Sequence, residues 1–158
     1  YDVILIDTPP SLSYMTINAF FASDGMIVPM TASMLDMVSS AQFWSLFSDL
    51  AASISKRLPD PKQYDFINIL LSKINNNDTT TRAVRDWIST VYGGKVMPVE
   101  IPMTAVSGSA ASEFATVFDI TKYEGDARTY KRAREAYESL ALAVEESIRM
   151  VWAKREKK

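Results

Sequence analysis

The opening stretch of the sequence gives the first indication of the fold and reads Tyr1-Asp2-Val3-Ile4-Leu5-Ile6-Asp7-Thr8-Pro9-Pro10-Ser11. Residues 3–6 form an unalternating aliphatic run, which is typical of a strand covered on both faces, as in a parallel sheet. Ligands of open α/β sheets bind beyond the carboxyl ends of the strands. We therefore expect Asp7 to stand at a ligand site.

Two further features of this stretch suit a metal-dependent switch. A carboxylate at a strand end can hold Mg²⁺, directly or through a water molecule, because this cation prefers oxygen ligands and keeps much of its hydration. Pro9 and Pro10 restrict the backbone and would stiffen the loop beside the metal. The plainer alternative is that Asp7 only caps a turn and that the prolines only end the strand.

The rest of the chain alternates between strand-like and helical stretches. Strands are predicted over 26–30, 66–71 and 95–99, and helices over 16–22, from about 35 to 54, and over 81–91. Loops or turns are expected at 58–61, 75–78 and 92–94, where Pro, Asn, Asp and Gly gather. Alternation of this kind predicts an α/β fold with a mostly parallel sheet flanked by helices.

The tail, from about 125 to 154, predicts the longest helix. Apolar residues recur there at three- and four-residue steps and form one stripe that should face the core. They are Tyr130, Ala133, Tyr137, Leu140, Val144, Ile148 and Val151. In the third helix, Val84, Trp87, Ile88 and Val91 are expected to lie on one face.

Composition excludes several classes of chemistry. The 158 residues include no Cys and no His, so thiolate or imidazole zinc sites and His-based catalytic triads are absent from this chain. No apolar run approaches the roughly 20 residues that a membrane span needs, and a cytoplasmic location is the default expectation. The net charge is −2, but 122–158 carry 10 Lys and Arg against 7 Asp and Glu.

A phosphate-binding loop is missing from the sequence. None of the five glycines lies in a G-x-x-x-x-G-K-[ST] pattern, which cradles phosphates in many α/β nucleotide enzymes. Either the chain is not part of a nucleotide enzyme, or the loop lies upstream of Tyr1. We expect the second, because the chain opens directly on a strand-like segment without an initiator Met.

Three segments carry a resemblance to a known family. Asp7-Thr8-Pro9-Pro10-Ser11, Asn18-Ala19-Phe20 and the run from Ala22 to Pro29 resemble the ParA family of plasmid and chromosome partition ATPases. Further segments are similar to the larger plasmid-borne members, including the RepA proteins of repABC plasmids. They are Met34-Leu35-Asp36-Met37, Gln42-Phe43, Phe118-Asp119-Ile120, Tyr130 and Arg132-Ala133.

The resemblance implies that residues 1–158 are the C-terminal portion of a single P-loop ATPase domain of the deviant Walker A class. It implies ATP and Mg²⁺ as cofactors, a homodimer in the ATP state, non-specific binding to duplex DNA, a ParB-type centromere-binding partner, no membrane, and a cytoplasmic, nucleoid-associated location. Because the phosphate loop is absent, the chain alone is expected to be inactive.

The resemblance also assigns residue roles. Asp7 matches the magnesium-side aspartate, and Thr8, Pro9 and Pro10 match the switch loop. Positions that approach the adenine base in relatives correspond to Lys73, Asn75, Pro102 and Met103; by residue type alone, Lys73 is a solvated lysine and Asn75 a turn residue.

The DNA contact is expected on the last helix, at Arg128, Lys131 and Arg132, with Lys122 and Arg134 nearby. Relatives with an Arg-rich segment after their Ile-Pro pair use it for DNA, but Met103 to Ser107 here contain no basic residue. The alternative is a solvated helix face whose charges pair with Glu124 and Asp126. Arg82 and Arg85 are a second candidate surface.

Two other functions remain open at this point. A MinD-like or other P-loop switch ATPase shares the motifs, and a MinD-like protein would end in a membrane-seeking helix. Glu138, Glu145 and Glu146 on the last helix argue against that ending. A non-catalytic interaction module, in which Asp7 to Pro10 are purely structural, is the alternative from a different class.

Overall fold

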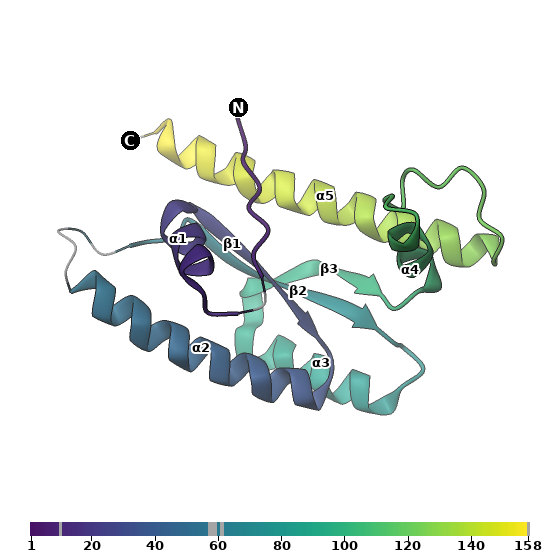
Figure 1. The fold of residues 1–158 in the computed structure, drawn as a ribbon, viewed down its shortest axis with the longest axis horizontal. Coiled ribbons are helices and arrows are strands. Elements are labelled where there is room, and N and C mark those ends of the chain that lie inside the picture. Colours follow the sequence, from purple (N-terminus) through teal and green to yellow (C-terminus); the bar gives the residue numbers. More distant parts are fainter. Residues whose placement is uncertain (10, 57–59, 61, 158) are drawn as a thin grey trace.

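A three-stranded parallel sheet forms the centre of the chain. The computed structural model describes residues 1–9, 11–56, 60 and 62–157. Strands β1 (Gly25–Thr31), β2 (Phe66–Ile74) and β3 (Val96–Pro102) lie in the order β1-β2-β3, and both pairings are parallel (Figure 1). The predicted parallel sheet is therefore confirmed, with each strand within a few residues of its expected bounds.

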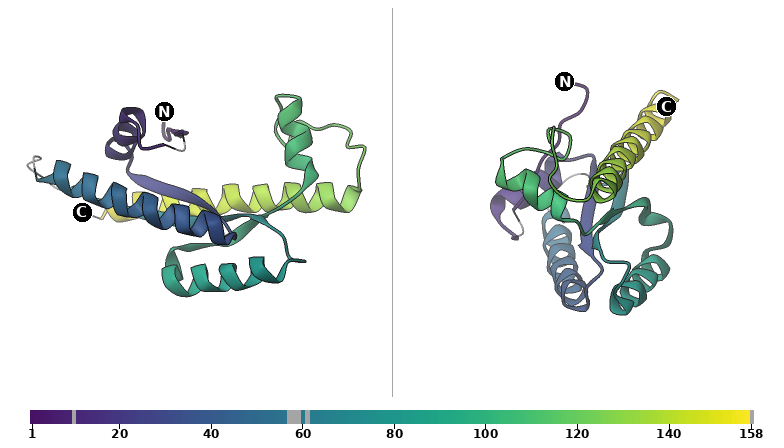
Figure 2. Two further views of the ribbon diagram at one scale, coloured as in Figure 1. Left: turned by 60° about the horizontal axis from the view of Figure 1, so that its bottom comes forward. Right: turned by 90° about the vertical axis from the view of Figure 1, so that its right-hand side faces the viewer.

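Helices cover both faces of this sheet. They are α1 (Tyr14–Ala22), α2 (Met34–Ser55), α3 (Thr79–Tyr92), α4 (Ala105–Ser112) and α5 (Ala127–Arg155), with a 3-10 turn η1 (Gly93–Lys95). Helices α2 and α3 lie on one face and α5 crosses the other (Figures 1 and 2). Parallel strands need such crossovers because each strand must return to the same end of the sheet before the next can begin.

Side-chain caps explain where four of these helices begin. Ser13, Ser33, Asp78 and Asp126 stand at the N-caps of α1, α2, α3 and α5, and each accepts a hydrogen bond from a backbone N–H of the first turn. A cap of this kind satisfies a donor that has no partner inside the helix. Short polar residues in front of the apolar periodicity therefore set the helix starts.

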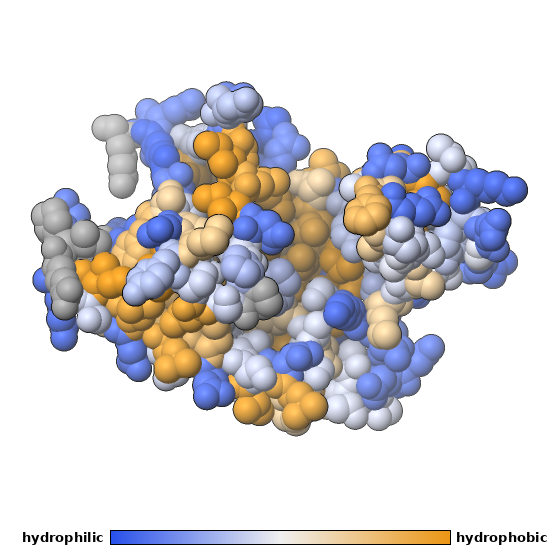
Figure 3. Space-filling model, viewed as in Figure 1, coloured by the Kyte–Doolittle hydropathy of each residue, from blue (hydrophilic) through white to orange (hydrophobic). Residues whose placement is uncertain are grey.

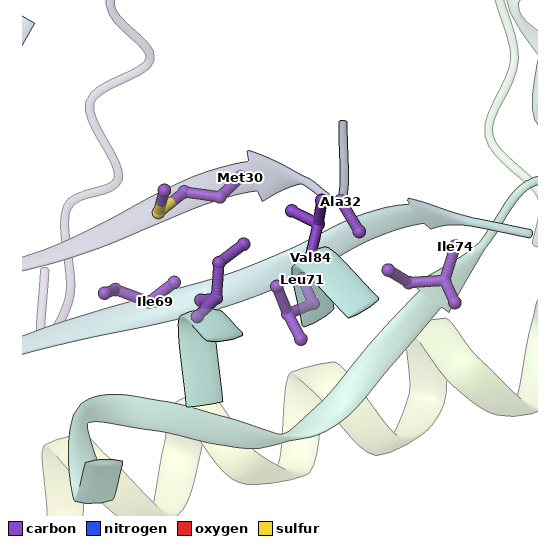
Figure 4. Packing of buried hydrophobic residues seen from close by; sticks show 7 residues of the cluster. Met30, Ala32, Ile69, Leu71, Ile74 and Val84 are labelled. Atoms are coloured by element: carbon purple, nitrogen blue, oxygen red, sulfur yellow. The ribbon is translucent and has the colours of Figure 1, made fainter. Parts of the chain in front are cut away.

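The main core lies between the sheet and α3. Its buried residues are Met30, Ala32, Ile69, Leu71, Ile74, Val84 and Ile88, six of which are labelled in Figure 4. Leu71 and Ile88 are completely buried. On α3, the buried stripe is Thr81, Val84 and Ile88, whereas Trp87 and Val91 are about half exposed. Of the four residues predicted to lie on one face of α3, Val84 and Ile88 are therefore buried, and Trp87 and Val91 are at its exposed edge.

A second core lies between the sheet and α5. Leu70, Met97 and Ile101 are buried against Ala136, Tyr137, Leu140, Ala143 and Val144 of the helix. Farther along, Ala133 packs with Val106 of α4 and Val117 of the following loop. The stripe predicted for the last helix therefore faces the core as far as Val144.

The opening segment differs from its prediction. Residues 1–9 form no strand, and Ile4 and Leu5 are 75% and 83% exposed. A strand exists only where a neighbour takes its backbone hydrogen bonds, and none of the three strands pairs with this segment. Its aliphatic side chains are visible as a hydrophobic strip at the top of Figure 3.

Other differences are local. Helix α4 was not predicted, because its sequence is built of small residues without an apolar period. The turn expected at 92–94 leads into η1, and the loop at 75–78 is confirmed. Of the loop at 58–61, only residue 60 is among the described residues. None of the described helices is both long and apolar enough to cross a membrane.

A matched pair of substitutions on α3 tests this packing. Val84 is 3% exposed and Val91 is 53% exposed. Val84→Ala should lower the free energy of unfolding by about 1.5–3 kcal/mol, because it removes buried methyl groups, and Val91→Ala by less than about 0.5 kcal/mol. Urea titration of both variants measures the difference; equal decreases would mean that α3 does not pack as described.

Candidate functional site

Two segments predicted to contact the nucleotide base lie side by side at the carboxyl edge of the sheet. Strands β2 and β3 end at Ile74 and Pro102, and the Met103 N–H donates a 3.0 Å hydrogen bond to the Ile74 carbonyl oxygen. This bond joins the stretch that carries Lys73 to the stretch that carries Pro102. The fold thus brings together positions about thirty residues apart in sequence.

The backbone at Lys73 has an unusual conformation. Its φ is +53°, in the left-handed region that side chains other than glycine rarely adopt. The β2–β3 register shifts between Leu71 and Ile74, and Ile74 packs in the same core cluster as Leu71. The irregularity therefore turns Ile74 back toward α3 and leaves the Lys73 side chain in solvent, as a bulge does.

Asn75 is the first residue of the turn that follows. Its side-chain Oδ1 accepts a 3.1 Å hydrogen bond from the Asn77 N–H, and its carbonyl accepts one from the Asp78 N–H at 3.1 Å. Asp78 then caps α3, and the hydrogen bond from the Thr80 N–H is the main cause that lowers the pKa of its carboxyl group. Asn75 thus acts as a turn residue.

Sequence reasoning missed Thr104 at this edge. Thr104 occupies the N-cap of α4, directly after Met103, but makes no side-chain capping bond. Its Oγ1 is buried and has no hydrogen-bond partner among the described residues. A buried hydroxyl without a partner is costly. The available signal was a Thr before a run of small residues, which is a common helix start.

Asp7 and its neighbours occupy a different place. The segment 1–8 lines a cavity of about 640 Å³ together with the starts of β1 and β2 and the last turns of α5. Asp7 is exposed, Thr8 is half-buried, and Pro10 lies outside the described residues. Within the described ranges no group of three or more carboxylates is placed to hold a metal ion. The structure therefore does not group Asp7 with the residues at the carboxyl ends of β2 and β3.

The basic residues predicted to contact DNA are divided between two environments. Lys131 forms an exposed ion pair with Glu135 at 3.7 Å. Arg132 lines a small cavity of about 180 Å³ with Glu100, Pro102 and Asn76, so it belongs to the carboxyl edge of the sheet. Arg128 lies in the exposed first turn of α5.

The alternative interpretation of this face had its charges pair with Glu124 and Asp126, but no such ion pair occurs among the described residues. Asp126 caps α5, and the hydrogen bonds from Thr129 lower the pKa of its carboxyl group. On the alternative surface, Arg85 pairs with Glu100 at 2.8 Å. Arg134 pairs with Glu138 at 3.0 Å and lies over the ring of Phe118.

Comparison with known proteins agrees with this architecture. Residues 1–59 match the family described as an AAA domain. A solved structure titled "Partition Protein" superposes with a TM-score of 0.63 at 17% identity, over 92% of this chain and 34% of that one. The chain therefore has the α/β fold of a partition protein.

Two curated proteins are similar in sequence. The putative replication protein A of Rhizobium rhizogenes is 26% identical over 98% of this chain and 38% of its own length. The chromosome-partitioning ATPase Soj of Thermus thermophilus is 27% identical over 85% of this chain and 52% of its own length. The resemblance to ParA-type partition ATPases is confirmed, and the chain spans between a third and about half of the length of these relatives.

A substitution at Lys73 tests the backbone strain at this position. Lys73→Gly should raise the free energy of unfolding by up to about 1 kcal/mol, because relief of the left-handed conformation exceeds the entropy cost of glycine. Lys95→Gly, at an exposed position where φ is ordinary, should lower it by about 0.5–1 kcal/mol. Thermal unfolding of both variants checks this; a decrease at Lys73 equal to that at Lys95 would contradict it.

Proposed function

We propose that this chain is part of a ParA-type partition ATPase, which binds MgATP and uses its hydrolysis to switch between states during DNA segregation. The observation that carries the proposal is the similarity of nearly the whole chain to replication and partition proteins, together with the Asp7-Thr8-Pro9-Pro10 motif. In such enzymes catalysis consists mainly of positioning and charge neutralisation.

In this proposal the base lies at the carboxyl edge of the sheet. Lys73 and Pro102 lie in the last residues of β2 and β3, and Asn75 and Met103 directly follow these strands, where open α/β sheets bind ligands. The Thr104 hydroxyl, which has no hydrogen-bond partner within the described part of the chain, adds a polar group there. Mg²⁺ would be held by Asp7, directly or through water, because a hard cation takes oxygen ligands; this assignment requires Asp7 to lie nearer the carboxyl edge in the ATP-bound protein than on the separate cavity that it lines here.

The triphosphate needs donors that these residues do not supply. A phosphate loop provides most of the backbone N–H groups for a nucleotide, and the sequence contains no such loop. We propose that the 158 residues alone do not turn over ATP, and that the complete protein dimerises in the ATP state. Duplex DNA and a ParB-type protein are its proposed partners, on the nucleoid in the cytoplasm.

The first test concerns Asp7. In the complete protein, Asp7→Ala should reduce Mg²⁺-dependent ATP hydrolysis by about two orders of magnitude or more, since removal of a group that stabilises transition-state charge typically costs this much. Asp2→Ala, in the same exposed segment, is the matched control and should keep turnover near that of the wild type. The 158-residue chain, assayed alongside, should show no turnover.

Wild-type turnover in Asp7→Ala would show that Asp7 is a turn residue and would favour the non-catalytic module. Equal reductions in Asp7→Ala and Asp2→Ala would indicate that the segment matters for folding rather than for the metal. Circular dichroism of each variant distinguishes these cases.

The second test concerns DNA. Replacing Arg128 and Lys131 together with Ala should weaken ATP-dependent binding to all duplex sequences alike. Each of the two removed charges that binds a phosphate should lower the slope of log affinity against log salt by about 0.9, because fewer counterions are released on binding. Arg149→Ala is the control on the same helix, since this arginine pairs with Glu145. An unchanged slope in the double variant would show that Arg128 and Lys131 do not contact DNA, and Arg82 and its surroundings would be tested next.

A further inference from the structure

Thr16 is one of two polar residues that are buried among the described residues. It lies in α1 and is 1% exposed, and the other, Thr81 in α3, is 7% exposed. Burying a hydroxyl group costs free energy unless the group is hydrogen-bonded. The partners of each hydroxyl therefore show what each threonine holds in place.

The Thr16 hydroxyl completes a small hydrogen-bond network at the start of α1. Its Oγ1 donates a 2.7 Å hydrogen bond to the Ser11 carbonyl oxygen, which can only accept. Because the Thr16 hydroxyl proton is used in this bond, Ser13 is the donor in the 3.1 Å contact between the Ser13 and Thr16 hydroxyls. The Ser13 Oγ in turn accepts from the Thr16 N–H at 3.3 Å. Both hydroxyl protons are thus used within the network.

Ser11 also belongs to the switch loop, residues 7–11. Its N–H donates a 2.8 Å hydrogen bond to the Pro9 carbonyl oxygen, while its own carbonyl is held by Thr16. Four residues of chain join Asp7 to Ser11, so their Cα atoms lie within about 14 Å of each other in any conformation of the loop. A fixed Ser11 therefore limits the positions that the Asp7 carboxylate can take.

Helix α1 is itself anchored, which gives this network a firm support. Phe20 lies one turn after Thr16 on the same side of the helix. It packs edge-on against the buried Phe47 of α2, with 4.5 Å between the ring centroids. The Phe20 carbonyl oxygen accepts a 2.9 Å hydrogen bond from the Tyr64 hydroxyl, just before β2. A continuous series of contacts therefore runs from α2 through α1 to Ser11.

We propose that Thr16 is a positioning residue for the switch loop: its hydroxyl fixes Ser11 to α1, and Ser11 limits where Asp7 can meet Mg²⁺ and the triphosphate. The inference rests on the proposed function, in which Asp7 to Pro10 act in the hydrolysis of MgATP, and it adds a residue outside that motif. Thr16 acts through Ser11 and not on the nucleotide. Its loss should therefore lower turnover more than it weakens substrate binding.

Steady-state ATP hydrolysis by the complete protein tests this role. Thr16→Val keeps the shape of the side chain but removes the hydroxyl. It should lower kcat about 10-fold or more, because a misplacement of about 1 Å can cost about 100-fold in rate. The KM for ATP should stay within about twofold of wild type, since the groups that bind ATP are unchanged. Thr16→Ser, which keeps the hydroxyl, should retain most of the wild-type kcat.

Thr81→Val is the matched control. It removes the other buried threonine hydroxyl, whose partner is Asp78 Oδ2 at 3.1 Å, at the start of α3. Asp78 keeps its 2.9 Å hydrogen bond from the Thr80 N–H, so the helix stays capped. Thr81→Val should lower the midpoint of thermal unfolding about as much as Thr16→Val, but leave kcat unchanged.

Amide hydrogen exchange of the complete protein without nucleotide examines the loop directly. In Thr16→Val, amides of 7–13 should exchange about 2- to 10-fold faster, the range that the loss of one hydrogen bond accounts for. In Thr81→Val they should exchange as in the wild type. A wild-type protein without ATP hydrolysis would contradict the proposed function, and exchange would still decide whether Thr16 holds Ser11.

Three results would overturn the proposal. A kcat in Thr16→Val no lower than in Thr81→Val would show that Thr16 does not position the loop. Equal losses in Thr16→Val and Thr16→Ser would assign the effect to packing rather than to the hydroxyl. Unchanged exchange over 7–13 would show that Ser11 is held by other contacts. If Thr16→Val does not fold, Thr16→Cys, whose thiol is a weak donor, should have a lower kcat than Thr16→Ser, and equal values would overturn the proposal instead.

Discussion

The parallel pairing of β2 with both of its neighbours is the constraint on which the rest of the structure depends. β2 is hydrogen-bonded along both edges and covered on both faces, with Leu71 buried against the α3 side and Leu70 against the α5 side. A strand enclosed in this way must be apolar without alternation. Because both cores share this strand, neither helical layer can form without it.

The same strand positions both ends of the molecule. At its carboxyl end, the irregularity at Lys73 returns Ile74 to the core and directs the following turn toward Met103. At its start, Asp65 is bonded to the residue that precedes β1 and receives the end of α5. Between them, Asn68 contacts Ser147. A polar pair in an otherwise apolar layer sets the register of a helix, because any shift would leave partly buried polar groups without partners.

Much of this architecture could be predicted from residue patterns. Apolar runs interrupted by turn residues located all three strands of the sheet, and the stripe from Tyr130 to Val144 located the face of α5 that packs on it. The patterns failed where a local signal was absent or depended on a partner. Helix α4 has no apolar period, and its position follows from Val106 packing against Ala133. The aliphatic run 3–6 has the composition of a strand, but no neighbour pairs with it.

In the candidate site, too, some features could be predicted from the sequence and others depended on the tertiary structure. By itself, the sequence determined which residue types are available: an aspartate after an aliphatic run, an Asn-rich turn, an Ile-Pro pair, and no thiol or imidazole. These follow from local chemistry, which each stretch carries with it. Only the tertiary structure decided which of them meet. It joined the Lys73 turn to Met103, drew Arg132 toward Glu100, and left Asp7 on a separate cavity. Such contacts depend on strand order and helix packing, which arise from many distant residues acting together and leave no signature in any one segment.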